Sequence, residues 1–171
     1  KIPDEEVKKV YYARNDSGSM LKTDGANTMA SEWMETIGCE NIASSIDGFN
    51  QEISFEQILK ENPDVIILMD VDGAAEIRDE ILSDPNWQSV TAVQNGEIYL
   101  NPSGVFYWDR YSTEEAMQIL WAAVTVYPEY FKDIDIVEET KNFYDTFFGY
   151  QLSDEEVNQI LNTEENTNIV Q

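Results

Sequence analysis

Three consecutive aromatic residues stand beside an acid–base pair in the segment 101–110. Phe106, Tyr107 and Trp108 precede Asp109 and Arg110. Aromatic rings provide apolar surface and stacking planes, and the planar guanidinium group of arginine donates paired hydrogen bonds to carboxylates, oxyanions and phosphates. This combination predicts a loop that grips a large planar or anionic molecule. In the alternative interpretation, the acid and the arginine neutralise each other while the rings pack on the last helix.

Asp70 and Asp72 form a second group that could do chemistry, because they directly follow the apolar run 65–69. Two carboxylates at such a place could bind magnesium in an open α/β site, as in a phosphatase. No phosphate-binding motif or Ser/Thr nucleophile accompanies them, so capping of the next helix is the favoured interpretation. Asp70 is kept as a candidate ligand contact.

The sequence lacks the residues that several other catalytic arrangements need. The sequence contains no histidine, which excludes Ser-His-Asp hydrolysis, Cys-His catalysis and histidine-ligated zinc or haem. Its single cysteine, Cys39, can form neither an internal disulfide nor a multi-cysteine metal site, and is expected to pack as a small apolar side chain. We therefore expect a protein that binds a ligand, is not an enzyme and carries no cofactor.

The composition indicates one acidic α/β core. The chain has 171 residues, 42% of them hydrophobic, and a formal net charge of −24. Such a surface repels the phosphates of nucleic acids and of anionic membranes, so neither is an expected partner. No apolar stretch approaches the length of a membrane span.

The pattern of apolar residues predicts strands that alternate with helices. Strands are expected at 10–13, 41–43, 65–69 and 97–100, with a short extended segment at 90–93. Helices are expected at 28–37, 54–61, 74–82, 112–128, 136–148 and 153–161. Ser54, Ser112 and Ser153 each begin a capping box. The alternation predicts an α/β fold: a doubly wound, mostly parallel sheet with helices on both faces and appended C-terminal helices.

This fold would bring the candidate residues to one edge, because ligands of such sheets bind at the carboxyl ends of the strands. Four loops leave strands at that edge: 14–18, the stretch after Ala43, 70–73 and 101–110. Arg14 and Asp70 thus join the aromatic loop as predicted ligand contacts.

Four segments resemble, in the same order, the class III substrate-binding proteins of ABC importers, which carry ferric siderophores, haem, cobalamin and some oxyanions. The similar segments are 38–42, 53–67, 84–99 and 108–129. Each alone is a weak signal, whereas the ordered set is specific. One departure is Tyr111, which follows Trp108-Asp109-Arg110 where the family usually has proline.

The resemblance covers only the C-terminal lobe of a two-lobed fold. It implies that 1–9 is the end of an interdomain helix or linker and that 10–131 is the α/β lobe. The sequence pattern adds 132–161 as a helical extension and 162–171 as a polar tail. The opposite wall of the ligand cleft would come from an N-terminal lobe outside this chain.

The resemblance also implies partners and a location. It predicts an extracytoplasmic protein, periplasmic or a cell-surface lipoprotein, that delivers a metal chelate to the membrane subunits of an importer. Glu56 matches a glutamate of this family that docks into basic pockets on those subunits. The alternative is that Glu56 only favours the dipole of its helix.

The identity of the ligand stays open at this point. A preformed chelate, such as a ferric siderophore, haem or a corrinoid, fits Phe106, Tyr107, Trp108 and Arg110. Arg110 equally suits molybdate or tungstate, and Tyr12 or Tyr107 could ligate haem iron. A stand-alone flavodoxin-like sensor or binding domain is the remaining alternative.

Overall fold

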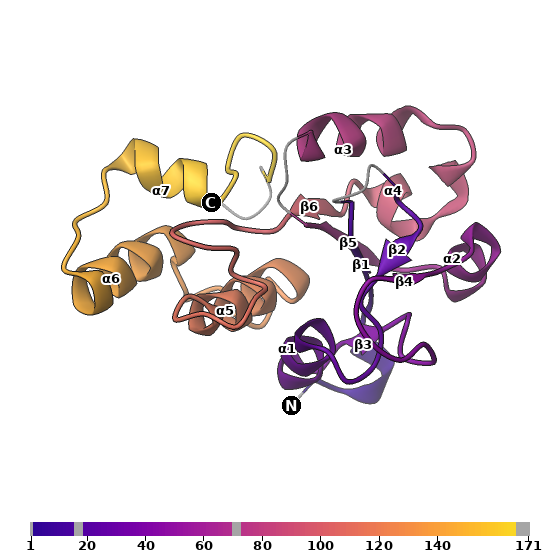
Figure 1. Cartoon of the computed structure of the whole chain (residues 1–171), viewed down its shortest axis with the longest axis horizontal. Helices are drawn as coiled ribbons and strands as arrows, with labels where there is room; N and C mark the ends of the chain where they lie inside the picture. Colours follow the sequence, from indigo (N-terminus) through magenta and orange to yellow (C-terminus); the bar gives the residue numbers. More distant parts are fainter. Residues whose placement is uncertain (1, 16–18, 70–72, 167–171) are drawn as a thin grey trace. The chain divides into compact units, whose positions relative to one another are not determined.

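The computed structural model describes residues 2–15, 19–69 and 73–166 (Figure 1). The chain divides into two compact units, Lys1–Leu100 and Asn101–Gln171. The first unit contains the sheet, and the second consists of a long loop followed by helices. The boundary expected after residue 131 stays a prediction, and within the second unit the helix 115–126 contacts the helix 136–148.

A mostly parallel sheet forms the centre of the first unit. Its parallel strands, in spatial order, are β3 (Glu40–Asn41), β1 (Lys9–Ala13), β5 (Val65–Leu68) and β6 (Ile98–Leu100). After β1 the chain forms β3 on one side of that strand, and it later forms β5 on the other side. The strand order therefore reverses between β1 and β5. The carboxyl ends of these two strands therefore flank the place where open α/β sheets bind ligands.

Two short antiparallel strands extend the sheet and were not predicted. β2 (Lys22–Thr23) pairs with the end of β1, and β4 (Gln51–Glu52) pairs with β2. Each has two residues and no alternation of apolar and polar side chains, so no periodic pattern in the sequence indicates either strand.

Helices cover both faces of the sheet, which confirms the predicted α/β class. The helices of this unit are α1 (Met29–Ile37), α2 (Phe55–Glu61), α3 (Ala74–Ser83) and α4 (Thr91–Asn95), with short 3-10 turns η1 (Asp4–Glu6) and η2 (Trp87–Ser89). Tyr11 and Ile66 share a buried cluster with Ile58 of α2 and Ile81 of α3. Side chains alternate along a strand, so Tyr12 points to the opposite face, where its ring meets Trp33 of α1 edge to face at 6.4 Å.

The prediction of an extended segment at 90–93 is wrong, because α4 begins there. The backbone amide of Thr91 donates to the side chain of Asn62 at 2.9 Å, and that of Ala92 donates to the carbonyl of Pro63 at 3.0 Å. The turn before β5 thus satisfies the first amides of a five-residue helix. No local pattern in 90–93 reveals such a distant partner.

The second unit contains α5 (Glu115–Val126), α6 (Ile136–Phe148) and α7 (Asp154–Ile160). The predicted capping box at Ser153 is confirmed, since its side chain and that of Glu156 exchange hydrogen bonds with each other's backbone amides. The box at Ser112 is wrong: the Ser112 hydroxyl accepts from the amide of Glu114 at 3.2 Å, and α5 begins one residue later. The side chain of Glu114 instead accepts hydrogen bonds from the backbone amides of Val105 and Phe106.

A turn follows α7, so the predicted polar tail begins with ordered structure. Asn166 is buried, and its side-chain amide donates to the carbonyl of Leu161 at 3.0 Å. Among the helices of the described residues, none is both long and apolar enough to cross a membrane.

Candidate functional site

In the first unit, the carboxyl end of β1 carries a buried ion pair. Arg14 follows the strand directly, and its Nη1 lies 3.3 Å from Oδ1 of Asp24. Asp24 is 1% exposed and also accepts a hydrogen bond from the backbone amide of Asn50 at 2.8 Å. The pair fixes a guanidinium group at the edge where the sequence predicts ligand contacts.

Asn15, the next residue, has a buried side chain whose amide nitrogen and oxygen find no hydrogen-bond partner among the described residues. Buried polar groups in native proteins are nearly always hydrogen-bonded, so an unsatisfied one calls for an explanation. At the carboxyl end of a central parallel strand, a ligand atom is one partner that would satisfy it. Asn15 therefore joins Arg14 as a candidate ligand contact.

In the second unit, the predicted aromatic loop has a defined backbone. Ser103 and Tyr107 form an isolated antiparallel bridge, and the amide of Gly104 donates to the carbonyl of Phe106 at 3.0 Å. The start of the loop is held by helices of the same unit. The side chain of Gln118 donates to that of Asn101 at 2.7 Å, and the amide of Ser103 donates to the carbonyl of Ile160 at 3.2 Å.

The buried carboxylate of Glu114 organises this loop. It accepts hydrogen bonds from the backbone amides of Val105 at 3.0 Å and Phe106 at 2.8 Å, and from the indole of Trp108 at 3.2 Å. The hydroxyl of Tyr144, on α6, donates to the same carboxylate. Glu114 is 1% exposed, so it is an internal hub that joins the loop to α6.

Two further features show how closely this hub is packed. Burial, followed by the hydrogen bond to Glu114, raises the pKa of the Tyr144 phenol above its ordinary value, which keeps it a donor. Gly104 lies so close that a Cβ there would overlap both the Tyr144 hydroxyl and the Glu114 carboxylate. Only glycine, which has no Cβ atom, therefore fits at this position.

The three predicted aromatic residues of the loop have different environments. Phe106 is 49% exposed and meets the half-buried ring of Tyr107 edge to face, with 5.3 Å between the ring centroids. Trp108 is entirely buried, and its indole is hydrogen-bonded to Glu114. The prediction that Trp108 contacts a ligand is therefore corrected: its ring supports the loop from inside, while Phe106 and Tyr107 offer exposed ring surface.

Arg110 is partly accessible, with 22% of its side chain exposed, and its Nη1 lies 3.9 Å from Oδ2 of the buried Asp109. The alternative in which these two residues neutralise each other is thus partly realised. The distance is at the long end for an ion pair.

The remaining predicted residues belong to the first unit. Glu56 is exposed in the first turn of α2, after the N-cap Ser54, whose hydroxyl accepts from the amide of Gln57 at 3.1 Å. Asp70 and Asp72 lie outside the described residues, so their roles as a ligand contact, magnesium ligands or helix caps stay predictions.

Cys39 packs as the sequence predicts. Its side chain is 9% exposed, and burial raises the pKa of the thiol to about 12. The thiolate, which is the nucleophilic form, is therefore scarce at neutral pH.

Sequence reasoning missed three residues of these clusters: Asn15, Asp24 and Glu114. Asn15 had a usable signal, because it is a polar residue two positions after a predicted strand. Asp24 and Glu114 had none, since each is one of 34 acidic residues and nothing local distinguishes a buried carboxylate from a solvated one.

The sheet, its reversal of strand order and the helices on both faces define an α/β lobe of the type that binds ligands at its strand ends. A family model described as periplasmic binding protein matches residues 1–104. The chain belongs to the periplasmic binding protein family.

Three similar proteins show how much of a whole binding protein the chain represents. The molybdate-binding protein MolA of Haemophilus influenzae is 30% identical over 143 residues, which cover 82% of this chain and 38% of MolA. A periplasmic solute binding protein from Veillonella parvula superposes with a TM-score of 0.84 at 29% identity, over 97% of this chain and 50% of that one. An ABC transporter solute binding protein from Sulfurospirillum deleyianum gives a TM-score of 0.81 at 31% identity, over 95% of this chain and 50% of that one. The chain spans about half the length of these solved proteins.

Proposed function

We propose that the chain is the C-terminal ligand-binding lobe of an extracytoplasmic solute-binding protein that delivers its ligand to an ABC importer. The observation that carries the proposal is the superposition of nearly the whole chain on half of a solute-binding protein. The ordered motifs of class III substrate-binding proteins support it independently. The lobe binds its ligand without converting it, and a second α/β lobe of the same protein completes the cleft.

Each unit has candidate ligand contacts of its own. Arg14 and Asn15 contribute donors at the end of β1, while Phe106, Tyr107 and Arg110 contribute two ring surfaces and a second guanidinium group. In a chain with a net charge of −24, two partly buried arginines favour a ligand that carries negative charge. An anionic metal chelate, such as a ferric siderophore or haem, uses both ring surfaces and guanidinium donors.

Molybdate or a similar oxyanion is a second candidate ligand, favoured by the identity with MolA. A small tetrahedral anion binds through guanidinium and amide donors and has no planar surface for Phe106 and Tyr107. The two candidates therefore make opposite predictions for the aromatic residues.

A titration of the complete two-lobed protein tests the proposal and separates these ligands. Calorimetry with ferric siderophores, haem, corrinoids and molybdate should identify one class that binds. Loss of a hydrogen bond to a charged partner costs about 1.5–3 kcal/mol, so Arg110→Gln should weaken binding by about 10- to 100-fold. Lys132→Gln, which removes an exposed positive charge in the same unit, is the matched control.

Variants of the aromatic residues then distinguish a metal chelate from molybdate as the ligand. Phe106→Leu and Tyr107→Leu should weaken binding of a chelate by about threefold to tenfold through lost stacking, and should leave the binding of molybdate unchanged. If no member of the panel binds, or if Arg110→Gln binds like the wild type, the proposed assignment of the site is wrong.

We propose further that Glu56 is a docking residue for the importer. It is exposed in the first turn of α2, where a basic pocket of a membrane subunit can reach it. Like-charge contacts at an interface cost several kcal/mol, so Glu56→Arg in the full-length protein should reduce uptake by about tenfold or more. Glu80→Arg, an equal charge reversal at an exposed position of α3, should transport normally. Unchanged uptake by Glu56→Arg, with ligand affinity intact, would argue against docking.

A further inference from the structure

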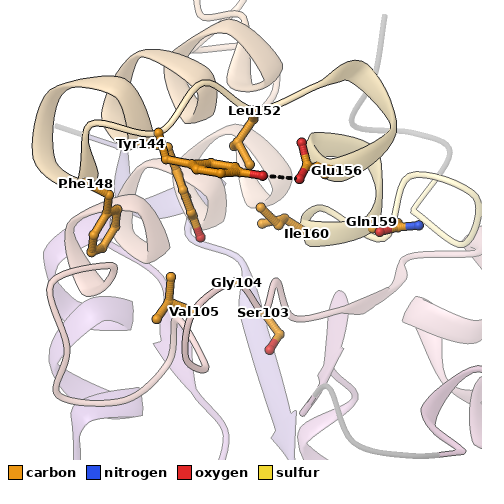
Figure 2. A pocket seen from close by; sticks show the side chains of 10 residues that line it. Ser103, Gly104, Val105, Tyr144, Phe148, Leu152, Glu156, Gln159 and Ile160 are labelled. Carbon is orange, nitrogen blue, oxygen red and sulfur yellow. Dashed lines mark hydrogen bonds between the residues drawn. The ribbon is translucent and has the colours of Figure 1, made fainter.

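A cavity of about 540 Å³ lies within the second unit, between the beginning of the aromatic loop and the last two helices (Figure 2). This volume falls in the range of small-molecule sites. It is lined by Ser103, Gly104 and Val105 of the loop, Tyr144 and Phe148 of α6, and Tyr150, Leu152, Glu156, Gln159 and Ile160 of the segment that ends in α7. Phe106, Tyr107 and Arg110 do not line it.

Aromatic rings dominate one side of this cavity. The rings of Tyr144 and Phe148 are 5.2 Å apart between centroids and inclined at 50°, so they form two walls of a corner rather than a flat stack. Phe148 is 40% exposed and Tyr150 is 51% exposed, which leaves ring surface facing solvent. In Figure 2 the Phe148 ring stands on the same side of the opening as Val105.

A fixed carboxylate completes the lining. The hydroxyl of Tyr150 donates to Oε1 of Glu156 at 2.6 Å, while Oε2 accepts from the backbone amide and the hydroxyl of Ser153, each at 2.8 Å. The hydrogen bond from Tyr150, followed by those from Ser153, lowers the pKa of Glu156 below its ordinary value. Glu156 is therefore held in place and ionised at neutral pH.

The charge of the cavity has one sign. None of its lining residues is basic, and the second unit as a whole has fourteen acidic and three basic residues. An anion would be repelled from this cavity. A cation would gain both the carboxylate and the negative faces of the rings, which attract positive charge by about 0.5–2 kcal/mol for each well-placed ring.

We propose that this cavity is a binding site for an organic cation, a substituted ammonium group attached to an aromatic or aliphatic body. The ammonium group lies against Tyr150 and Glu156, and the body of the ligand covers Leu152 and Ile160 and reaches Phe148 and Val105 on the other side of the opening (Figure 2). This cavity favours a positively charged ligand, whereas Arg14 and Arg110, which we propose as contacts of the transported ligand, favour a negatively charged one. The two proposals can therefore be tested independently, and the failure of one does not affect the other.

A matched pair of probes tests the proposal on the chain as it is. Phenyltrimethylammonium and its neutral isostere tert-butylbenzene have the same shape and differ in charge. Saturation-transfer and chemical-shift NMR titrations should show the cation binding saturably and about fivefold to tenfold more tightly than the isostere. Equal binding of the two probes, or no saturable binding of the cation, overturns the proposal.

Four substitutions locate the site, two inside the cavity and two controls beside it. Phe148→Leu should weaken binding of the cation by about threefold to fivefold through lost contact with the body of the ligand, and Phe147→Leu, at a neighbouring exposed ring that does not line the cavity, should not. Glu156→Gln keeps the capping box, because glutamine serves in that role, but removes the charge and should weaken binding by about threefold to tenfold.

Glu155→Gln removes the same charge from the same turn outside the cavity, so it should leave cation affinity unchanged. Equal losses within either pair would mean that general surface charge or nonspecific apolar contact causes the binding, and would overturn the proposed site. Circular dichroism at increasing temperature checks that all four variants stay folded.

Discussion

Asp24 in the first unit and Glu114 in the second are both 1% exposed, and each organises a loop next to candidate ligand contacts. Their partners differ in charge. Asp24 faces the guanidinium group of Arg14, whereas the hydrogen bonds described for Glu114 come from two backbone amides, an indole and a phenol. One buried charge is thus balanced by a counter-ion, and the other by several neutral donors.

This difference has a physical consequence. A carboxylate without a counter-ion is stable in the interior only while enough donors point at it, and removing it leaves each donor unsatisfied. A carboxylate paired with an arginine near a strand end can share that arginine with an incoming anion. The Glu114 hub is therefore suited to rigidity, and the Arg14–Asp24 pair to adjustment when a ligand binds.

The largest effect is expected from Glu114→Leu. Four donors lose their acceptor at about 1–3 kcal/mol each, partly relieved by water, so the free energy of unfolding of the second unit should fall by about 3–5 kcal/mol. Glu114→Gln, which keeps one acceptor oxygen, should cost about 2 kcal/mol. Urea unfolding gives these values, and hydrogen exchange of the Val105 and Phe106 amides should accelerate in both variants. Exposed Glu138→Leu is the control, and a similar loss there would remove the distinction between the two kinds of carboxylate.

A smaller effect is expected where the hub meets Gly104. Gly104→Ala places a methyl group against the Tyr144 hydroxyl and should destabilise the second unit by about 2 kcal/mol. Tyr144→Phe removes that hydroxyl, so the double variant should be about 1 kcal/mol more stable than the sum of the single effects predicts. Strict additivity in this cycle would show that the loop is not packed against the hub.

The two units also differ in how far the sequence could predict them. The strands of the parallel sheet and α6 carry strong apolar periodicity, and their positions agree with the prediction to within one or two residues. The strands β2 and β4 and the helix α4 are short and depend on distant partners such as Asn62, so local patterns could not reveal them.

The candidate site was predictable only in part, for a related reason. Residue type identified Phe106, Tyr107 and Arg110 as groups able to hold a ligand, but it could not show that Trp108 turns inward. That orientation depends on Glu114, which the sequence presented as part of a helix cap. A buried carboxylate is recognised by its donors, and these come from segments up to 30 residues away in the sequence.

Asp24→Asn tests the same comparison in the first unit, at the buried carboxylate that is paired with an arginine. The amide keeps an oxygen for the Asn50 amide but loses its ionic attraction to Arg14, so the first unit should lose about 1–2 kcal/mol. This loss should be smaller than that of Glu114→Leu. Exposed Glu52→Gln in β4 serves as the control for urea unfolding. A cost above that of Glu114→Leu would show that the counter-ion, rather than the number of donors, decides how a buried carboxylate is held.

The smallest effect concerns a carboxylate at the surface, where water replaces either kind of partner. Glu61 accepts a hydrogen bond from Nζ of Lys9 at 3.0 Å, and this bond lowers the pKa of the carboxyl group. A lowered folded-state pKa adds stability that is present above the ordinary glutamate pKa and is lost as the pH falls through the lowered one. In Lys9→Met, the pKa of Glu61 measured by carboxyl ¹³C NMR should rise toward its ordinary value, and added salt should have the same effect in the wild type. Asp154, whose pKa is lowered in the same way by Lys141, is the internal control and should titrate unchanged in the variant. If the pKa of Glu61 changes neither in Lys9→Met nor with added salt, the carboxylate is held by something other than this surface pair.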